Sequence, residues 1–152
     1  KVIGWSRGPK KMDGVECFHG RGQLGGVLQA ASIVVILLPS TEQTINLIDK
    51  VALNAMPKDA ILVNCSRGEI VVDDDLISAL DSGHLRGATL DAFRQEPLPS
   101  GHPFWQHPKI CVTPHIASLS APDTAALILA DQLHCARNRQ RVANTVNIEQ
   151  GY

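Results

Sequence analysis

The fold is decided by residues 60–91, which read AILVNCSRGEIVVDDDLISALDSGHLRGATLD. The apolar run at residues 60–64 predicts a strand. Aspartates then open a helix at residues 73–80, where the helix dipole favours negative charge, and Gly83 ends it. A second apolar run at residues 87–91 predicts another strand. A strand, a helix and a strand in this order form one unit of a parallel sheet.

The same alternation continues on both sides of this unit. Further strands are predicted at residues 2–5, 33–38 and 110–113, and further helices at residues 24–31, 49–56 and 122–138. The strands are nearly all apolar rather than alternating, so we expect both faces of the sheet to be covered. The predicted fold class is therefore α/β, with a doubly wound parallel sheet.

Composition points to a globular protein with a specific small ligand. The chain has 152 residues, the size of one domain, of which 44% are hydrophobic and 19% charged. Its 14 Lys and Arg balance 15 Asp and Glu, which leaves no broad charge to bind nucleic acid or an acidic membrane surface. The longest apolar run, residues 33–38, is far shorter than the about 18 residues that cross a bilayer.

The cysteines and the first residues of the chain lead to expectations about its cellular compartment and about the length of the natural protein. Cysteines stand at positions 17, 65, 111 and 135, with no close pair of the kind that binds zinc or forms a redox motif. We therefore expect reduced thiols and a cytoplasmic location. Residues 1–5, KVIGW, form an apolar run without an initiator Met, so we expect a fragment of a longer protein.

Residues 20–25 match the dinucleotide fingerprint G-x-G-x-x-G letter for letter. That fingerprint requires a full strand before it and an acidic residue at the end of the next strand. The preceding strand could only be residues 15–18, which Glu16 interrupts, and the next apolar run, residues 33–38, ends without an acid. We interpret the match as an ordinary loop and helix start.

The strand predicted at residues 2–5 is followed by Ser6 and Arg7, with Lys10 and Lys11 close behind. A hydroxyl and cations at the place of the usual ribose-binding acid suit a ribose 2′-phosphate, which indicates NADP. A solvated basic turn is the alternative interpretation of this segment.

Polar residues follow three of the predicted strands and bring Arg67, Glu96 and His115 to one edge of the sheet. A guanidinium grips a carboxylate in a bidentate fork, so Arg67 could hold a 2-oxo acid. His115 could donate a proton to the carbonyl oxygen during reduction, and Glu96 could orient the imidazole and favour its protonated form.

Three stretches, NCSRGEIVVDDDL (64–76), GATLDAFRQEPLP (87–99) and VTPHIAS (112–118), resemble the signatures of the D-isomer-specific 2-hydroxyacid dehydrogenases. LLPSTEQTINLID (37–49) and PFWQHPKICVTPH (103–115) bring the chain closest to the glyoxylate/hydroxypyruvate reductases of that family. The resemblance covers essentially the whole chain. It implies a Rossmann-like NAD(P)-binding domain and the reduction of small 2-oxo acids, such as glyoxylate and hydroxypyruvate, with NAD(P)H.

The resemblance also assigns roles to individual residues. It makes Arg67 the anchor of the substrate carboxylate and Glu96 the partner of the catalytic His115. It implies cofactor contacts, with NADPH preferred over NADH, at Ser6, Arg7, Leu38, Pro39, Cys65, Ser66 and Asp91.

The family's first strand and glycine-rich loop precede the strand that opens this chain, so we expect both to be lacking. Residues 1–120 are then most of the NAD(P)-binding domain, and residues 121–152 are a helix and tail that return to a substrate domain. The resemblance implies a homodimer of the complete protein. Two alternatives stay open, a non-catalytic Rossmann-like fragment that binds a nucleotide or partner, and a metal site formed by His102, His107 and His115.

Overall fold

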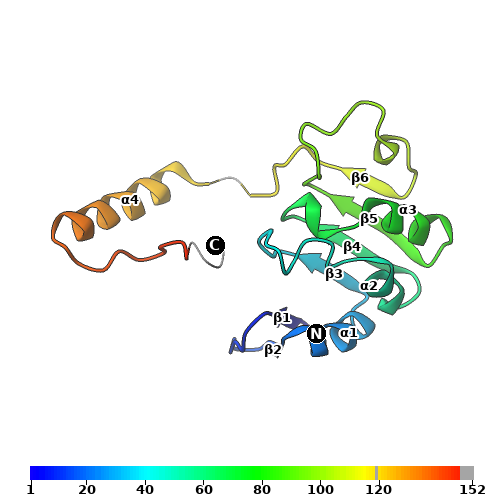
Figure 1. Cartoon of the computed structure of the whole chain (residues 1–152), viewed down its shortest axis with the longest axis horizontal. Coiled ribbons are helices and arrows are strands. Elements are labelled where there is room, and N and C mark those ends of the chain that lie inside the picture. Colours follow the sequence, from blue (N-terminus) through cyan, green and yellow to red (C-terminus); the bar gives the residue numbers. More distant parts are fainter. Residues whose placement is uncertain (119, 148–152) are drawn as a thin grey trace. The chain divides into compact units, whose positions relative to one another are not determined.

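The computed structural model of the protein describes residues 1–118 and 120–147 (Figure 1). The chain divides into two compact units, Lys1–His115 and Ile116–Tyr152. The division falls a few residues before the boundary predicted at residue 120. All the predicted site residues belong to the first unit, and the second contains helix α4 (Pro122–Arg137).

The strands of the first unit form two parallel sheets (Figure 1). The larger sheet has the order β3 (Ile33–Ile36), β4 (Ala60–Asn64), β5 (Leu85–Leu90) and β6 (Ile110–Val112). The smaller sheet pairs β1 (Ile3–Ser6) with β2 (Glu16–His19). Every pairing between named strands is parallel. The predicted α/β fold class with parallel sheets is therefore confirmed.

The four strands of the larger sheet lie in space in the order in which they follow along the chain, as in one half of a doubly wound sheet. The smaller sheet is a separate parallel pair.

Three helices of the first unit supply one side of its core. They are α1 (Arg21–Ala30), α2 (Lys50–Ala55) and α3 (Asp73–Asp81). The Ala52 amide donates to the Asp49 carboxylate at 2.9 Å, which caps α2. Gly83, with φ of 73°, follows the end of α3 in a left-handed conformation that suits glycine. Short 3-10 turns lie at Gly68–Ile70 and Pro103–Trp105.

The expectation that both faces of the sheet are covered is wrong for β3. Val34 and Ile36 point into the core, whereas Ile33 and Val35 are 59% and 54% exposed. Successive strand residues point to opposite faces, so a continuous apolar run supplies a second apolar face whether or not anything covers it. The core cluster draws its helical residues from α1, α2 and α3 on the side of Val34 and Ile36.

Strand β2 corrects the interpretation of residues 15–18. The four residues Glu16–His19 form a regular strand because they pair with β1 along its whole length, and exposed Glu16 forms an ion pair with Lys1 at 2.6 Å. Gly20, with φ of 71°, makes the turn, and α1 begins at Arg21 rather than at the predicted residue 24. A Cβ added at Gly22 or Gly25 would meet nothing within 4 Å. These glycines therefore do not serve the close helix–strand packing that the dinucleotide fingerprint requires.

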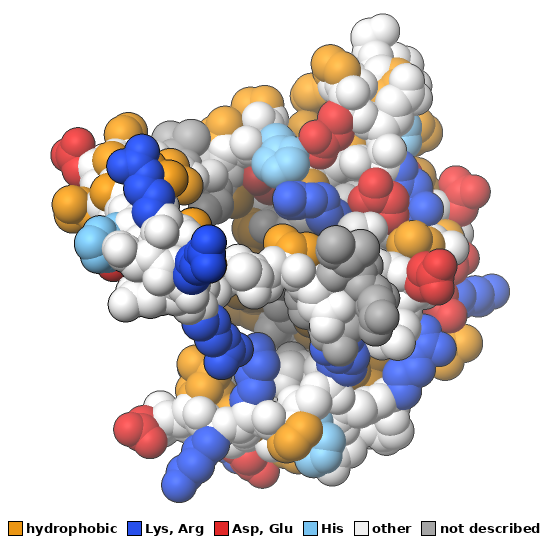
Figure 2. Space-filling view, turned by 60° about the vertical axis from the view of Figure 1, so that its left-hand side comes forward, with side chains coloured by type: hydrophobic (Ala, Val, Ile, Leu, Met, Phe, Trp, Pro, Cys, Tyr) orange, Lys and Arg blue, Asp and Glu red, His pale blue; other side chains and the backbone are white. Residues whose placement is uncertain are grey.

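The second unit carries the predicted final helix, but its apolar stripe is uncovered. Within α4, Ile128, Leu129 and Leu133 are 47%, 63% and 53% exposed, and no residue of this helix is buried. Among the described residues, no helix combines the length and apolar character needed to span a membrane. Figure 2 shows both acidic and basic side chains at the surface.

Candidate active site

The carboxyl ends of β4, β5 and β6 lie side by side because Asn64 pairs with Leu90 and Leu90 with Val112. The polar residues that follow these strands therefore meet at one edge. His115 Nδ1 lies 2.9 Å from Glu96 Oε2 and 3.1 Å from Oε1. Arg67 is close enough for its charge to affect the Glu96 carboxylate. The structure thus pairs Glu96 with His115, and Arg67 follows the neighbouring strand β4 at the same edge of the sheet.

Glu96 is held as a carboxylate by its neighbours. Its hydrogen bond with His115 lowers its pKa, and the Phe93 amide, which donates to Oε1 at 3.0 Å, lowers it further. Because Nδ1 of His115 faces Glu96, Nε2 is the ring nitrogen left for a substrate. The His115 side chain is 46% exposed, so a ligand can reach it. Its backbone lies in the left-handed region, with φ of 53°, which is uncommon for a residue with a side chain.

Arg67 projects from the loop that follows β4. Its Nη1 donates to the Ser66 carbonyl at 2.7 Å. The structure records no other side-chain hydrogen bond of Arg67 among the described residues, and the residue is exposed. A guanidinium has five N–H donors, so most of them remain for an anionic ligand.

Asn64, which the sequence analysis did not single out, shapes the turn that presents Arg67. Its side chain is buried, accepts from the amide and hydroxyl of Ser66 at 3.1 Å and 3.0 Å, and donates to the Arg67 carbonyl at 2.9 Å. Its own carbonyl accepts from the Asp91 amide at 2.9 Å. The sequence did contain one sign of this role: Asn64 is a polar residue at the last position of an otherwise apolar strand.

Asp91 lies at the end of β5 and is 2% exposed. The Thr113 hydroxyl donates to Asp91 Oδ1 at 2.5 Å, and the Thr113 amide donates to the Leu90 carbonyl at 3.0 Å. A buried carboxylate needs such donors, since an unpaired one is costly. Thr113 was also missed, because its role depends on the register between β5 and β6.

The other predicted cofactor contacts lie at the carboxyl ends of their strands. Leu38 is partly buried against the core, and the carbonyl of exposed Pro39 accepts from the Thr44 hydroxyl at 2.6 Å. The Cys65 amide donates to the Ile36 carbonyl at 3.3 Å, which joins the ends of β3 and β4.

At the end of β1, the Ser6 hydroxyl donates to the Gly8 carbonyl at 2.8 Å, and Arg7 is exposed. Lys10 and Lys11 are exposed as well. Ser6 is the last residue of β1 and Arg7 follows it, and Lys10 and Lys11 lie further along the next loop. The other predicted cofactor contacts follow strands of the larger sheet.

The three histidines of the alternative metal site contact different carboxylates. His102 Nε2 lies 3.6 Å from Asp73, His107 Nε2 lies 3.2 Å from Asp81, and His115 pairs with Glu96. Within residues 1–118 and 120–147, no group of three or more His, Cys, Asp or Glu side chains could hold a metal ion.

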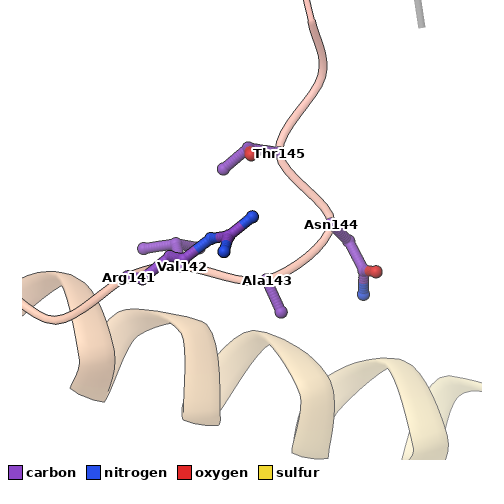
Figure 3. Close-up of a pocket in the computed structure, with 5 residues that line it drawn as sticks. All are labelled: Arg141, Val142, Ala143, Asn144 and Thr145. Carbon is purple, nitrogen blue, oxygen red and sulfur yellow. The ribbon is translucent and has the colours of Figure 1, made fainter.

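An open pocket in the second unit is formed by five consecutive residues, Arg141, Val142, Ala143, Asn144 and Thr145 (Figure 3). All five follow α4, and none of them is among the predicted site residues. The pocket therefore adds no group to the candidate active site.

Comparison with known proteins gives the family of the chain. Residues 1–117 match the model of the D-isomer specific 2-hydroxyacid dehydrogenase NAD-binding domain. The chain belongs to this family. The matched segment includes every residue proposed above for substrate or cofactor binding.

Solved structures of other D-2-hydroxyacid dehydrogenases superpose on the chain. An enzyme from Xanthobacter autotrophicus Py2, in complex with NADPH and MES, is 43% identical, with a TM-score of 0.96 over 99% of this chain and 62% of that chain. A family member from Klebsiella pneumoniae 342 is 40% identical, with a TM-score of 0.88 over 97% of this chain and 48% of that chain.

A third solved structure is an NADPH-dependent glyoxylate/hydroxypyruvate reductase from Sinorhizobium meliloti in complex with NADP and sulfate. It is 31% identical, with a TM-score of 0.93 over 100% of this chain and 49% of that chain. The chain therefore spans between about half and two thirds of the length of these relatives.

Proposed function

We propose that this dehydrogenase reduces small 2-oxo acids, such as glyoxylate and hydroxypyruvate, to 2-hydroxy acids, with NADPH as the preferred cofactor and NADH as the lesser one. The observation that carries the proposal is the hydrogen-bonded pair of Glu96 and His115, 2.9 Å apart, beside Arg67 at the edge where parallel strands end. The similarity to the glyoxylate/hydroxypyruvate reductase of Sinorhizobium meliloti supports the substrate class.

Each of the three residues has a distinct part in the reduction. Arg67 holds the substrate carboxylate in a bidentate fork and so orients the carbonyl group. His115 donates a proton from Nε2 to the carbonyl oxygen, and the Glu96 carboxylate at Nδ1 stabilises the charged imidazolium before transfer. The nicotinamide, when bound, supplies the hydride that the carbonyl carbon accepts.

The chain offers groups that suit both ends of the cofactor. Buried Asp91 would hold the nicotinamide carboxamide, and Ser6 and Arg7 would hold the adenosine 2′-phosphate. The loops that begin at Leu38 and Cys65 would contact the cofactor between these ends. A hydroxyl and a guanidinium are suitable donors for a phosphate, and an ionised carboxylate accepts from an amide N–H.

The direct test is the oxidation of NADPH by the protein in its natural full-length form, followed by absorbance with glyoxylate and hydroxypyruvate in turn. Turnover that depends on either acid would support the proposal. Binding of NADPH without any turnover would instead favour the alternative of a non-catalytic nucleotide-binding protein.

The cofactor preference gives a separate prediction. The substitution Arg7→Asp removes a cation and places a negative charge near the 2′-phosphate. It should therefore weaken the use of NADPH and leave the use of NADH unchanged. The ratio of kcat/KM for NADPH to that for NADH should fall at least about tenfold, which corresponds to about 1.4 kcal/mol. Lys58→Asp, at an exposed position outside the candidate site, is the matched control and should leave the ratio unchanged. An equal ratio in Arg7→Asp and the parent would contradict the placement of the 2′-phosphate.

The Glu96–His115 contact predicts a loss of turnover. The Glu96 carboxylate lies 2.9 Å from His115 Nδ1 and orients the imidazole, and glutamine at this position keeps the shape of the side chain but not its charge. In Glu96→Gln, kcat for 2-oxo acid reduction should therefore fall by about tenfold, while the affinity for NADPH stays unchanged. An unchanged kcat would show that Glu96 does not support the proton donor.

The lowered pKa of Glu96 also predicts a change in stability with pH. A carboxylate whose pKa is lowered by folding adds stability above its ordinary value of 4.5, and this contribution is lost as the pH falls through the lowered value. The parent should therefore be more stable than Glu96→Gln at neutral pH, and the difference should vanish in acid. Denaturant unfolding at a series of pH values measures this, with Glu42→Gln as an exposed control.

We further propose a homodimer in the cytoplasm, in which residues 121–152 join a substrate domain. The exposed apolar side chains of α4 support an association of this segment with another surface, and the four cysteines, which are free thiols, suit a reducing compartment. Sedimentation of the natural full-length protein tests the dimer.

A further inference from the structure

Arg94 begins the loop that carries Glu96, and its side chain reaches into a neighbouring loop. Its Nε donates to the Val71 carbonyl at 3.1 Å. Its Nη2 donates to the same carbonyl and to the Glu69 carbonyl at 3.2 Å. These carbonyls belong to the segment that follows Arg67. The guanidinium therefore joins the loop of Glu96 to the loop of Arg67.

A third loop meets the same guanidinium. Nη2 of Arg94 also donates to Asn46 Oδ1, and the Asn46 amide donates to the Glu69 carbonyl at 2.8 Å. Asp73 lies 3.6 Å from Nε of Arg94. Burial raises the pKa of Asp73, and the nearby charges of Arg94 and His102 oppose that rise. We name Arg94 with Asn46, Glu69, Val71 and Asp73 the Arg94 clamp; it connects the loops that follow β3, β4 and β5.

A steric contact presses the same two loops together next to Arg67. Gly68 is buried, and a Cβ added there would lie 2.0 Å from the Phe93 carbonyl carbon and 2.2 Å from the Arg94 nitrogen. The backbone of one loop thus occupies the space that any side chain at position 68 would need. Polar and steric contacts therefore both determine the separation of Arg67 from Glu96.

We propose that Arg94 is a positioning residue for the reduction: its clamp keeps Arg67, which anchors the substrate, in register with Glu96, which orients the proton donor. This inference rests on the proposed function. Arg94 itself does not belong to the proposed set of substrate-binding groups. Its importance follows from geometry, since a displacement of about 1 Å between reacting groups can cost about 100-fold in rate. A planar guanidinium presents five N–H donors in a rigid fork, whereas an ammonium group has three donors on a flexible stem.

The test compares Arg94→Met with Arg86→Met in the natural full-length protein. Both changes remove one positive charge and keep an unbranched side chain, but Arg86 is exposed on β5 and the structure records no hydrogen bond or ion pair for its side chain among the described residues. In Arg94→Met, kcat for glyoxylate should fall by about 10- to 100-fold. KM for glyoxylate should change far less than kcat, because Arg67 still binds the carboxylate while the proton donor is out of register. The affinity for NADPH should stay the same, and Arg86→Met should behave as the parent.

Hydrogen exchange gives a readout that does not depend on activity. The amides of Asn46, Ile48 and Val72 bond across the loops that the clamp joins, to the carbonyls of Glu69, Ile70 and Ile48. They should exchange faster in Arg94→Met and not in Arg86→Met. Unchanged exchange would overturn the clamp, and faster exchange with normal kcat would overturn its positioning role. Full activity of Arg94→Lys would also overturn it, because charge alone would then suffice.

The proposed function and the Arg94 clamp can be tested separately. If the parent protein does not reduce any 2-oxo acid, the proposed function fails and the positioning role fails with it. The exchange experiment still decides in that case whether the Arg94 clamp holds the three loops together.

Discussion

Replacing His115 with alanine should lower kcat for 2-oxo acid reduction by about 100-fold or more, since a positioned general acid contributes about 10² to 10⁴ in rate. The imidazole is the group in the candidate site that is both exposed to a ligand and held by a carboxylate, at 2.9 Å. Its removal leaves Arg67 and the cofactor contacts in place. The loss should therefore appear in kcat, while the affinity for NADPH stays unchanged.

The measurement is steady-state reduction of glyoxylate with saturating NADPH. His134→Ala is the matched control, because His134 is exposed on α4 in the second unit. Thermal unfolding of both variants separates a loss of chemistry from a loss of folding. Turnover of His115→Ala within a few-fold of the parent would show that His115 is not the proton donor, regardless of the result for Glu96 variants.

Replacing Arg67 with lysine should raise KM for the 2-oxo acid by about 10- to 100-fold. Lysine keeps the positive charge but loses the planar fork that grips both carboxylate oxygens. A hydrogen bond to a charged group is worth about 1.5–3 kcal/mol, and about 1.4 kcal/mol corresponds to a factor of ten. The hydrogen bond of Arg67 to the Ser66 carbonyl is local, so its loss should leave the Glu96–His115 pair intact.

The pattern of the effect matters as much as its size. KM should rise far more than kcat falls, in contrast to Glu96→Gln. Arg137→Lys, on the exposed surface of α4, serves as the control for the exchange of one basic residue for another. An unchanged KM in Arg67→Lys would assign the substrate carboxylate to another group.

Elements with strong local signals were predicted close to their observed bounds. Strand β4 has the predicted ends, Ala60 and Asn64, because an apolar run is bounded by a turn before it and polar residues after it. Helix α3 has the predicted start at Asp73, and Gly83 lies beyond its end with the positive φ that glycine adopts readily. These signals act within a few residues of chain.

Elements that depend on distant partners were predicted less well. Strand β2 was missed because its four residues are stabilised by pairing with β1. The exposed face of β3 was missed because an apolar run does not say whether a helix covers it. The Arg94 clamp joins residues separated by 23 and 48 positions, and no local pattern marks such a contact.

For the candidate site, the sequence by itself determined which chemical groups follow which strands: Arg67 after β4, Glu96 after β5 and His115 after β6. It also determined, through the parallel strands, that these groups share one edge. The resemblance implied that Glu96 and His115, 19 positions apart, are partners, and only the tertiary structure gave the geometry of that pair, with 2.9 Å between Glu96 Oε2 and His115 Nδ1. That distance depends on the register between β5 and β6 and on the contacts of the two loops, and both arise from packing between segments that are remote in the chain.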